Sequence, residues 1–220
     1  MKYELIDGNI AKITLDNGKA NAISFDVASD LMNALDKAKE EAKAVLICGS
    51  PGIFSAGFDL KVISQGMDVA QKMLQQGMLM TEKIYSHPQP VITACEGHSV
   101  GMGVFIMLAA DYRVGAKGEF AIRLPETAIN MHFTKILKII AKSHIAPTHH
   151  ARAIIQSRPY SPEQAAEVGM LDEVVSADKV IEQATMRAKE LSELPPKQYA
   201  TNKLYMREDE INDIRESLGL

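Results

Sequence analysis

The chain has 220 residues, with 24 Lys and Arg residues against 28 Asp and Glu residues and a formal net charge of −4 at pH 7. The two signs of charge are mixed along the chain, so we expect neither nucleic acid nor an anionic membrane surface as a partner. The length allows one sizeable core or a main domain with a helical appendage, and we expect the second.

Cysteine usage and the N-terminal stretch suggest a location in the cell. Cys48 and Cys95 both lie in apolar runs, which argues against a disulfide framework and favours a reducing environment. The opening MKYELIDGN lacks the apolar core of a signal sequence and is interpreted as a strand. No apolar stretch approaches the roughly 20 residues that a membrane span requires. We therefore expect a cytoplasmic protein with no membrane partner.

The first 50 residues predict a strand, helix, strand order. Two short runs of alternating polarity flank Asp7-Gly8, which is a common hairpin signal. Ser24 fits the N-cap of a helix, and the apolar residues that follow recur at helical spacing up to Ala38. The apolar run 44–48 is typical of a buried strand.

Two glycine-containing stretches follow buried strands and lead into helices. The first is GIFSAGFDL, residues 52–60, which precedes a short helix and then a longer one rich in methionine. The second is EGHSVGMG, residues 96–103, after the strand 91–95. It opens a helix over 104–110 that is apolar on all sides and must lie at the centre of the fold. Two short strands, YRVGA and EFAI, then lead to RLPETAINM.

From about Met131 the chain is predicted to be mainly helical. SPEQAAEVGML is interpreted as a capped helix ending at Gly169, DEVV as a brief strand, and SADKVIEQATMRAKELSEL as a long amphipathic helix. Pro195-Pro196 separates a last charged helix. We therefore divide the chain into a core over residues 1–130 and a helical region over residues 131–220.

The two glycine-containing turns carry the main functional signal. Glycine allows backbone conformations closed to other residues, so consecutive N–H groups can point into a shared space. Helix N-termini add unpaired donors and a partial positive charge. Two such turns can jointly hold one oxyanion, although a lone turn of this kind is more often a simple tight turn. The spacing in GHSVGMG is not that of a dinucleotide site.

FSAGFDL, GHSVGMG with AADYRV, and the later LPETAI together resemble the oxyanion-hole and acidic segments of the crotonase family, the enoyl-CoA hydratases and isomerases. The resemblance runs in the same order from LDNGKANAIS to SPEQAAEVGMLDEVV. It implies an α/β fold of repeated ββα units with a C-terminal helical region for oligomerisation and active-site cover. It also implies an acyl-CoA thioester substrate, no separate cofactor because coenzyme A is part of the substrate, no metal, and a homotrimer or dimer of trimers.

The resemblance also assigns roles to individual residues. The thioester oxygen would bind the backbone N–H groups of Phe58 and Met102, and the Phe58 ring would pack or line the acyl pocket. Coenzyme A would contact two segments, 19–22 and 56–59. The residues assigned to it there are Lys19, which would also meet a phosphate, Ala20, Ala22, Ala56 and Asp59.

The acidic residues decide between two chemistries. Hydratases of the family use two glutamates, of which the second matches Glu126 and the first falls at Phe105, which has no proton to exchange. A single carboxylate can take a proton from one carbon and return it to another. We therefore expect an isomerase in which the apolar Phe105 raises the Glu126 pKa. The alternatives are a hydratase in which Glu126 works with another polar group such as His132, and an acyl-CoA-binding protein with little turnover.

Other residues in or near these motifs have structural interpretations. Asn130 stands where the family often has glycine, and asparagine tolerates a left-handed backbone. Asp111 and His98 are expected to serve local hydrogen bonding and packing. The chain also ends earlier than many hydratases of the family. That ending would reduce the helical cover over the acyl pocket or leave the cover to a neighbouring subunit.

Overall fold

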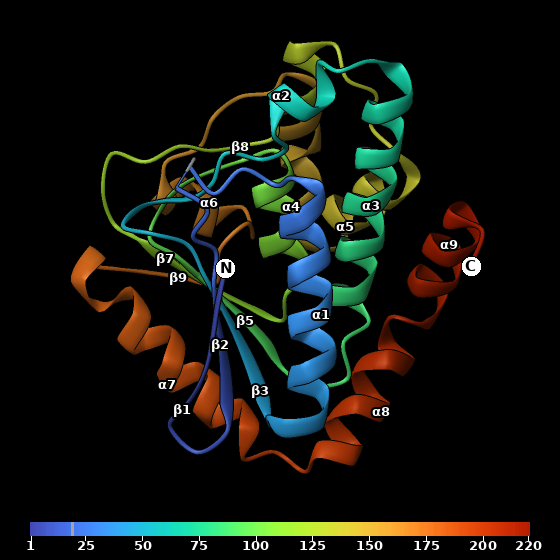
Figure 1. Ribbon diagram of the computed structural model, residues 1–220. Helices are drawn as coiled ribbons and strands as arrows, with labels where there is room; N and C mark the ends of the chain where they lie inside the picture. Colours follow the sequence, from blue (N-terminus) through green and yellow to red (C-terminus); the bar gives the residue numbers. More distant parts are fainter. Residues whose placement is uncertain (19) are drawn as a thin grey trace.

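The computed structural model describes residues 1–18 and 20–220. Its main sheet has the strand order β1-β2-β3-β5-β7-β9 (Figure 1). β1 and β2 pair antiparallel across the turn at Asp7-Gly8, as the hairpin signal predicted, and the later pairs in this described sheet are parallel. The bounds of the strands are Lys2–Ile6, Ile10–Thr14, Ala44–Cys48, Val91–Cys95, Tyr112–Ala116 and Glu173–Val175.

A second, smaller sheet lies within the stretches that the sequence presented mainly as turns. Its strands are β4, Gly52–Ser55, β6, Gly97–Val100, and β8, Ile122–Arg123, paired parallel in that order. Each follows a strand of the main sheet and precedes a helical segment. This confirms the repeated ββα units. Because β4 and β6 take up part of the stretches 52–60 and 96–103, the turns themselves are shorter than these two sequence motifs.

Helices cover the two faces of the main sheet (Figure 1). One face packs against α1, Phe25–Glu41, α3, Met67–Tyr85, and α4, Met102–Ala109. The other face packs against α7, Val180–Ser192. Successive residues of β3 alternate between the two clusters, because side chains of a strand point to opposite faces. The hydroxyl of Ser24 caps α1 as predicted.

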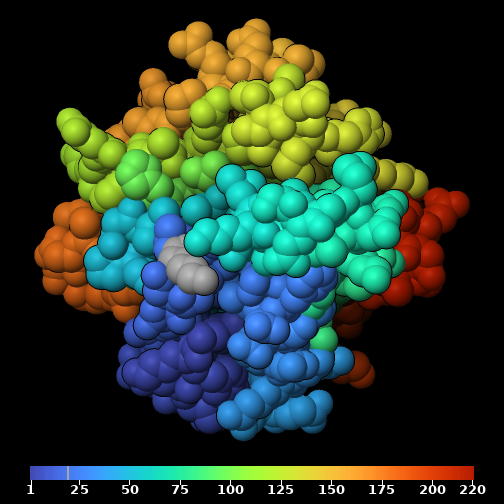
Figure 2. Space-filling view, turned by 45° about the horizontal axis from the view of Figure 1, so that its top comes forward, coloured from blue at the N-terminus to red at the C-terminus, as the bar shows by residue number. Residues whose placement is uncertain are grey.

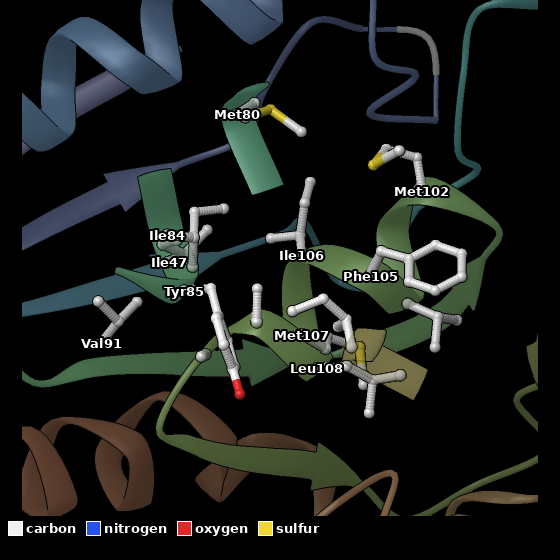
Figure 3. Close-up of a cluster of buried hydrophobic side chains, with 14 of the residues drawn as sticks. Ile47, Met80, Ile84, Tyr85, Val91, Met102, Phe105, Ile106, Met107 and Leu108 are labelled. Atoms are coloured by element: carbon white, nitrogen blue, oxygen red, sulfur yellow. The ribbon is translucent and has the colours of Figure 1, made fainter. Parts of the chain in front are cut away.

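The central helix α4 is buried on every side, as its sequence predicted. Its side chains, including Ile106, Met107 and Leu108, leave the helix in different directions and meet neighbouring elements around it (Figure 3). α4 therefore fixes the start of the second glycine-containing turn relative to the core, since Met102 is the first residue of the helix.

After residue 130 the chain contains further helices and one strand. α5, Lys135–His144, and α6, Pro162–Glu167, precede β9, which pairs with β7 at the edge of the main sheet. The predicted last helix is two helices, α8, Pro196–Met206, and α9, Glu208–Leu218. They break at Arg207, whose guanidinium binds Asp111 of the core. The division at residue 130 stays a prediction. No helix among the described residues has the length and apolar character needed to cross a membrane.

Candidate functional site

The first turn presents a free backbone donor at Phe58. Gly57 has a φ of +84°, a left-handed conformation that favours glycine. Ile23 N–H donates to the Gly57 carbonyl at 2.8 Å, and Asp59 N–H donates to the Ile23 carbonyl at 2.9 Å. Between these two bonds, the N–H of Phe58 donates to no other described residue. The Phe58 ring lines a cavity, as one of the two predicted roles requires.

The two segments predicted to contact coenzyme A lie side by side. Ala56 N–H donates to the Ala20 carbonyl at 3.0 Å, and the buried Asn21 side chain donates to the Phe54 carbonyl at 3.1 Å. Ser55 donates its hydroxyl to the Asn21 carbonyl at 2.7 Å and accepts from Gly57 N–H at 3.2 Å. Asn21 and Ser55 therefore set the first turn, which the motif alone did not indicate.

The residues that were assigned to coenzyme A differ in where they lie relative to the cavity. Ala56 lines the cavity, whereas Ala20 and Ala22 are not among its lining residues. The carboxylate of Asp59 caps the short helix α2, Leu60–Ile63, by accepting from Lys61 N–H at 2.9 Å. Lys19 lies outside the described residues. The contacts of these residues with coenzyme A stay predictions.

The second turn supplies a matching donor at Met102. Gly101 has a φ of +53°, and its N–H donates to the Arg123 carbonyl at 2.9 Å. The N–H of Met102, at the start of α4, donates to no other described residue. A Cβ atom added to Gly57 would stand 3.3 Å from the Met102 nitrogen. The two turns are thus in direct contact at one cavity, and each leaves one N–H free.

The carboxyl of Glu126 faces the same place from a third element. Glu126 begins the 3₁₀ helix η1, Glu126–Ile129, which ends at Asn130 in the predicted left-handed conformation. Its Oε1 would lie 3.5 Å from a Cβ atom added to Gly101. The side chain is 5% exposed, and Oε2 has no hydrogen-bond partner among the described residues. Burial raises the pKa of Glu126 from 4.5 to about 7.

The three elements enclose a cavity of about 290 Å³. On the surface, the region of α2 and the start of α3 faces the segment after β8 (Figure 2), and residues of both line the cavity. Glu126 is the single carboxyl group among its described lining residues. The lining residues are Ala56, Gly57, Phe58, Leu60, Ile63, Leu74, Val100, Gly101, Met102, Phe105, Arg123, Pro125, Glu126, Ile129, Met131, His132 and Leu137.

Phe105 lies in this wall, one turn along α4 from Met102 (Figure 3). It is fully buried, and its ring packs edge-on against Phe133 at 5.6 Å between centroids. The exposed His132 and the half-buried Arg123 also line the cavity. Arg123 carries a charge that the motif did not mark as part of the site.

The family model described as enoyl-CoA hydratase/isomerase matches residues 6–217. The chain belongs to this family, the crotonase family. A probable enoyl-CoA hydratase from Bacillus subtilis is 27% identical over 92% of this chain and 83% of its own length. An enoyl-CoA hydratase/isomerase family protein from Pseudomonas syringae is 36% identical, with a TM-score of 0.93 over 99% of this chain and 94% of that chain.

A protein from Mycobacterium tuberculosis, named an enoyl-CoA isomerase in one solved structure and a probable enoyl-CoA hydratase in another, is also similar to this chain. Its apo structure is 31% identical to this chain, with a TM-score of 0.93 over 99% of this chain and 95% of that chain. The comparisons confirm the crotonase family and its α/β fold. They include proteins named as hydratases and as isomerases, so the choice of reaction depends on the site residues of this crotonase-family member.

The remaining predicted structural residues lie outside the cavity lining. His98 Nδ1 accepts from Ala121 N–H at 3.0 Å, and its ring packs edge-on against Phe120. Asp111 accepts from Val91 N–H at 2.8 Å and binds two basic side chains. Among the described residues, no group of three or more His, Cys, Asp and Glu side chains is placed to hold a metal ion.

Proposed function

We propose that the protein is an enoyl-CoA isomerase that converts a 3-enoyl-CoA into the conjugated 2-enoyl-CoA. The observation that carries the proposal is the single carboxyl group in the described cavity wall, with the apolar Phe105 in the same wall. Hydration with two cooperating carboxylates requires a second acid. Moving a double bond requires one group that removes a proton and then returns it.

In the proposed reaction, the ionised carboxylate of Glu126 removes a proton from C2 of the 3-enoyl chain. The electron pair of that C–H bond moves toward the thioester carbonyl, which gives a dienolate with its negative charge on oxygen. The N–H groups of Phe58 and Met102 stabilise this oxygen, because they have no other described acceptor. The protonated Glu126 then returns its proton to C4, which leaves the double bond between C2 and C3.

The environment of Glu126 suits both steps. A pKa of about 7 places the carboxyl near half-ionisation at neutral pH, so one group serves as base and then as acid. Phe105 and Leu137 make the described wall largely apolar. With few polar groups near the acyl chain of the substrate, return of the proton to the dienolate is favoured over attack by water.

Hydration is the second candidate function, because His132 lines the same cavity. In that reaction Glu126 and His132 would together activate a water molecule for addition at C3. Incubation with 2-enoyl-, 3-enoyl- and 3-hydroxyacyl-CoA, followed by separation of the products by mass, distinguishes the two. Isomerisation predicts formation of 2-enoyl-CoA with little 3-hydroxyacyl-CoA. Rapid formation of 3-hydroxyacyl-CoA favours the hydratase, and binding without conversion favours an acyl-CoA-binding protein.

We further propose that the enzyme acts in the cytoplasm as a homotrimer or a dimer of trimers. Cys48 and Cys95 are free and buried, which suits a reducing compartment. The coenzyme A part of the substrate would follow the adjoining segments 20–22 and 56–59, with Lys19 at its phosphates. The role of Lys19 is tested by isothermal titration calorimetry, in which coenzyme A is titrated into the unaltered protein and into the Lys19→Ala variant. Unchanged affinity at low ionic strength would remove Lys19 from the site.

A further inference from the structure

A single serine outside the cavity lining contacts the segments on both sides of Glu126. Ser157 follows the short π-helical segment η3, Ala151–Ile155, and is 2% exposed. Its φ is +50°, in the left-handed region that residues other than glycine rarely occupy. Strained residues of this kind persist where the surrounding structure holds them, and they cluster at functional sites.

Two hydrogen bonds join Ser157 to the chain before and after Glu126. The hydroxyl of Ser157 accepts from Ala128 N–H at 3.3 Å, within the 3₁₀ helix that Glu126 begins. The carbonyl of Ser157 accepts from Arg123 Nε at 2.7 Å, three residues before Glu126. A third contact comes from the same region, since the Thr127 hydroxyl donates to the Ile154 carbonyl at 3.1 Å.

The same contacts extend to the oxyanion turn. The carbonyl of Arg123 accepts from Gly101 N–H, and Gly101 directly precedes the Met102 donor. Ser157 therefore binds Arg123, whose carbonyl binds the second turn at Gly101. It also binds η1, the helix that carries Glu126. One buried residue connects the two parts of the site whose relative position controls proton transfer.

The carboxyl of Glu126 depends on this backbone support. Its Oε2 has no described hydrogen-bond partner, so no polar side chain of the described protein fixes that oxygen. The charged or titratable side chains that share its cavity wall are Arg123 and His132, and neither is hydrogen-bonded to it. The position of the carboxyl consequently follows the position of η1.

We propose that Ser157 is a positioning residue for Glu126: its hydroxyl and its left-handed backbone hold η1 so that the carboxyl stays buried against the oxyanion turn. The inference rests on the proposed function for its catalytic consequence. Its structural consequence, the burial of Glu126, is independent of the reaction.

Two substitutions separate the hydroxyl from the backbone strain. Ser157→Gly removes the hydroxyl and relieves the left-handed conformation, while the carbonyl bond to Arg123 remains available. Ser157→Ala removes the hydroxyl and keeps the strain. Ser192→Ala is the matched control, because that hydroxyl bonds the Lys189 carbonyl on the far helix α7. We expect Ser157→Gly to unfold within a few degrees of the unaltered protein, so that a folded variant is available.

The first measurement uses the folded proteins without substrate. Carbon-13 labelling of the glutamate carboxyls follows the pKa of Glu126, whose signal is assigned by its absence in Glu126→Gln. We expect the pKa to fall by about one unit or more in Ser157→Gly, because a displaced η1 lets water reach the carboxyl. An unchanged Glu126 pKa in the folded Ser157→Gly variant overturns the proposal, whatever reaction the enzyme catalyses.

The second measurement is kinetic. On a 3-enoyl-CoA that the unaltered enzyme converts, we expect kcat to fall on the order of 10- to 100-fold in both variants with KM little changed, because a misplaced base costs rate rather than binding. Equal kcat in Ser157→Gly and in the unaltered enzyme also overturns the proposal. If the unaltered enzyme fails to isomerise, the proposed function is wrong and the carboxyl titration still decides the role of Ser157.

Discussion

At the scale of single residues, the burial of Glu126 has a cost that varies with pH. The unfolded chain ionises this carboxyl near 4.5, whereas the folded chain keeps its proton up to about pH 7. Between these values the folded state binds more protons, so the free energy of unfolding decreases as pH rises across the window. The shift corresponds to about 3 kcal/mol.

Glu126→Gln removes this cost. We expect the variant to gain stability relative to the unaltered protein as pH rises from 4.5 to 8, with most of the difference present above pH 7. Urea unfolding at several pH values measures the two curves. Parallel curves over this range would show that the Glu126 pKa is ordinary and that the carboxyl is hydrated.

The same substitution tests the chemistry. Because an amide cannot accept the C2 proton, we expect Glu126→Gln to lose isomerisation by on the order of 10²- to 10⁴-fold. In the unaltered enzyme, kcat/KM should rise about tenfold per pH unit below pH 7 and level off above it, since the free base is the active form. Glu119→Gln, at an exposed position before β8, is the control and should keep full activity. Retained isomerisation in Glu126→Gln would make His132 the next residue to test.

At the scale of elements, contact between the two glycine turns is the feature that activity depends on. Gly57 and Gly52 have φ values of +84° and +85°, so an added methyl group strains both backbones by about 1–2 kcal/mol. At Gly57 the methyl would stand 2.8 Å from the Val100 carbonyl and 3.3 Å from the Met102 nitrogen, whereas at Gly52 nothing lies within 4 Å.

Gly57→Ala should therefore lose activity that Gly52→Ala keeps. We expect kcat to fall on the order of 10²-fold in Gly57→Ala, because the displaced Met102 N–H no longer meets the oxyanion. Gly57→Ala should also lose more stability than Gly52→Ala in urea unfolding, because only the methyl group at Gly57 would stand within 3 Å of a backbone atom, and both variants should remain folded. Equal kcat values for the two variants would mean that the Met102 donor is not part of the reaction.

The sequence predicted these turns better than it predicted what supports them. Capping residues and apolar periodicity are local, so Ser24 and the buried α4 followed from the sequence, while the left-handed Asn130 followed from the resemblance to the family. The strands of the second sheet were harder to predict from the sequence, because β8 has only two residues and pairs with a segment distant along the chain. Asn21 and Ser157 were missed for the same reason, since their partners lie about 30 residues away along the chain.

At the scale of the whole molecule, the terminal helices attach to the core through buried charges. Asp111, at the start of β7, binds Lys203 of α8 at 2.6 Å and Arg207 at 3.0 Å, and all three side chains are largely buried. Burial lowers the pKa of Lys203 to about 8, so its charge is retained at neutral pH. Loss of Asp111 would leave two buried cations without their shared anion.

Asp111→Asn should therefore destabilise the protein by about 3–5 kcal/mol. The exposed pair of Lys135 and Asp213 provides the control, since Asp213→Asn removes a solvated contact and should cost less than about 1 kcal/mol. Urea unfolding measures both variants, and limited proteolysis should cut Asp111→Asn first in α8 and α9. Equal stabilities would show that the charge cluster does not hold the terminal helices.

We expect the outer surface of α8 to form the contact between subunits of the proposed trimer or dimer of trimers. Its residues are exposed or half-buried, apart from the buried side chain of Lys203, and its C-terminal end exposes Tyr205 and Met206 at 75% and 78%. Exposed apolar residues that gather in one place mark contact surfaces between proteins. We therefore expect light scattering at micromolar concentration to give the mass of three or six chains, and the double substitution Tyr205→Asp with Met206→Lys to reduce it.

Met186→Lys, on the exposed side of α7, is the control and should leave the mass unchanged. A monomeric mass for the unaltered protein would contradict the trimer, whereas an unchanged mass in the double variant would place the contact on another surface of the helical region.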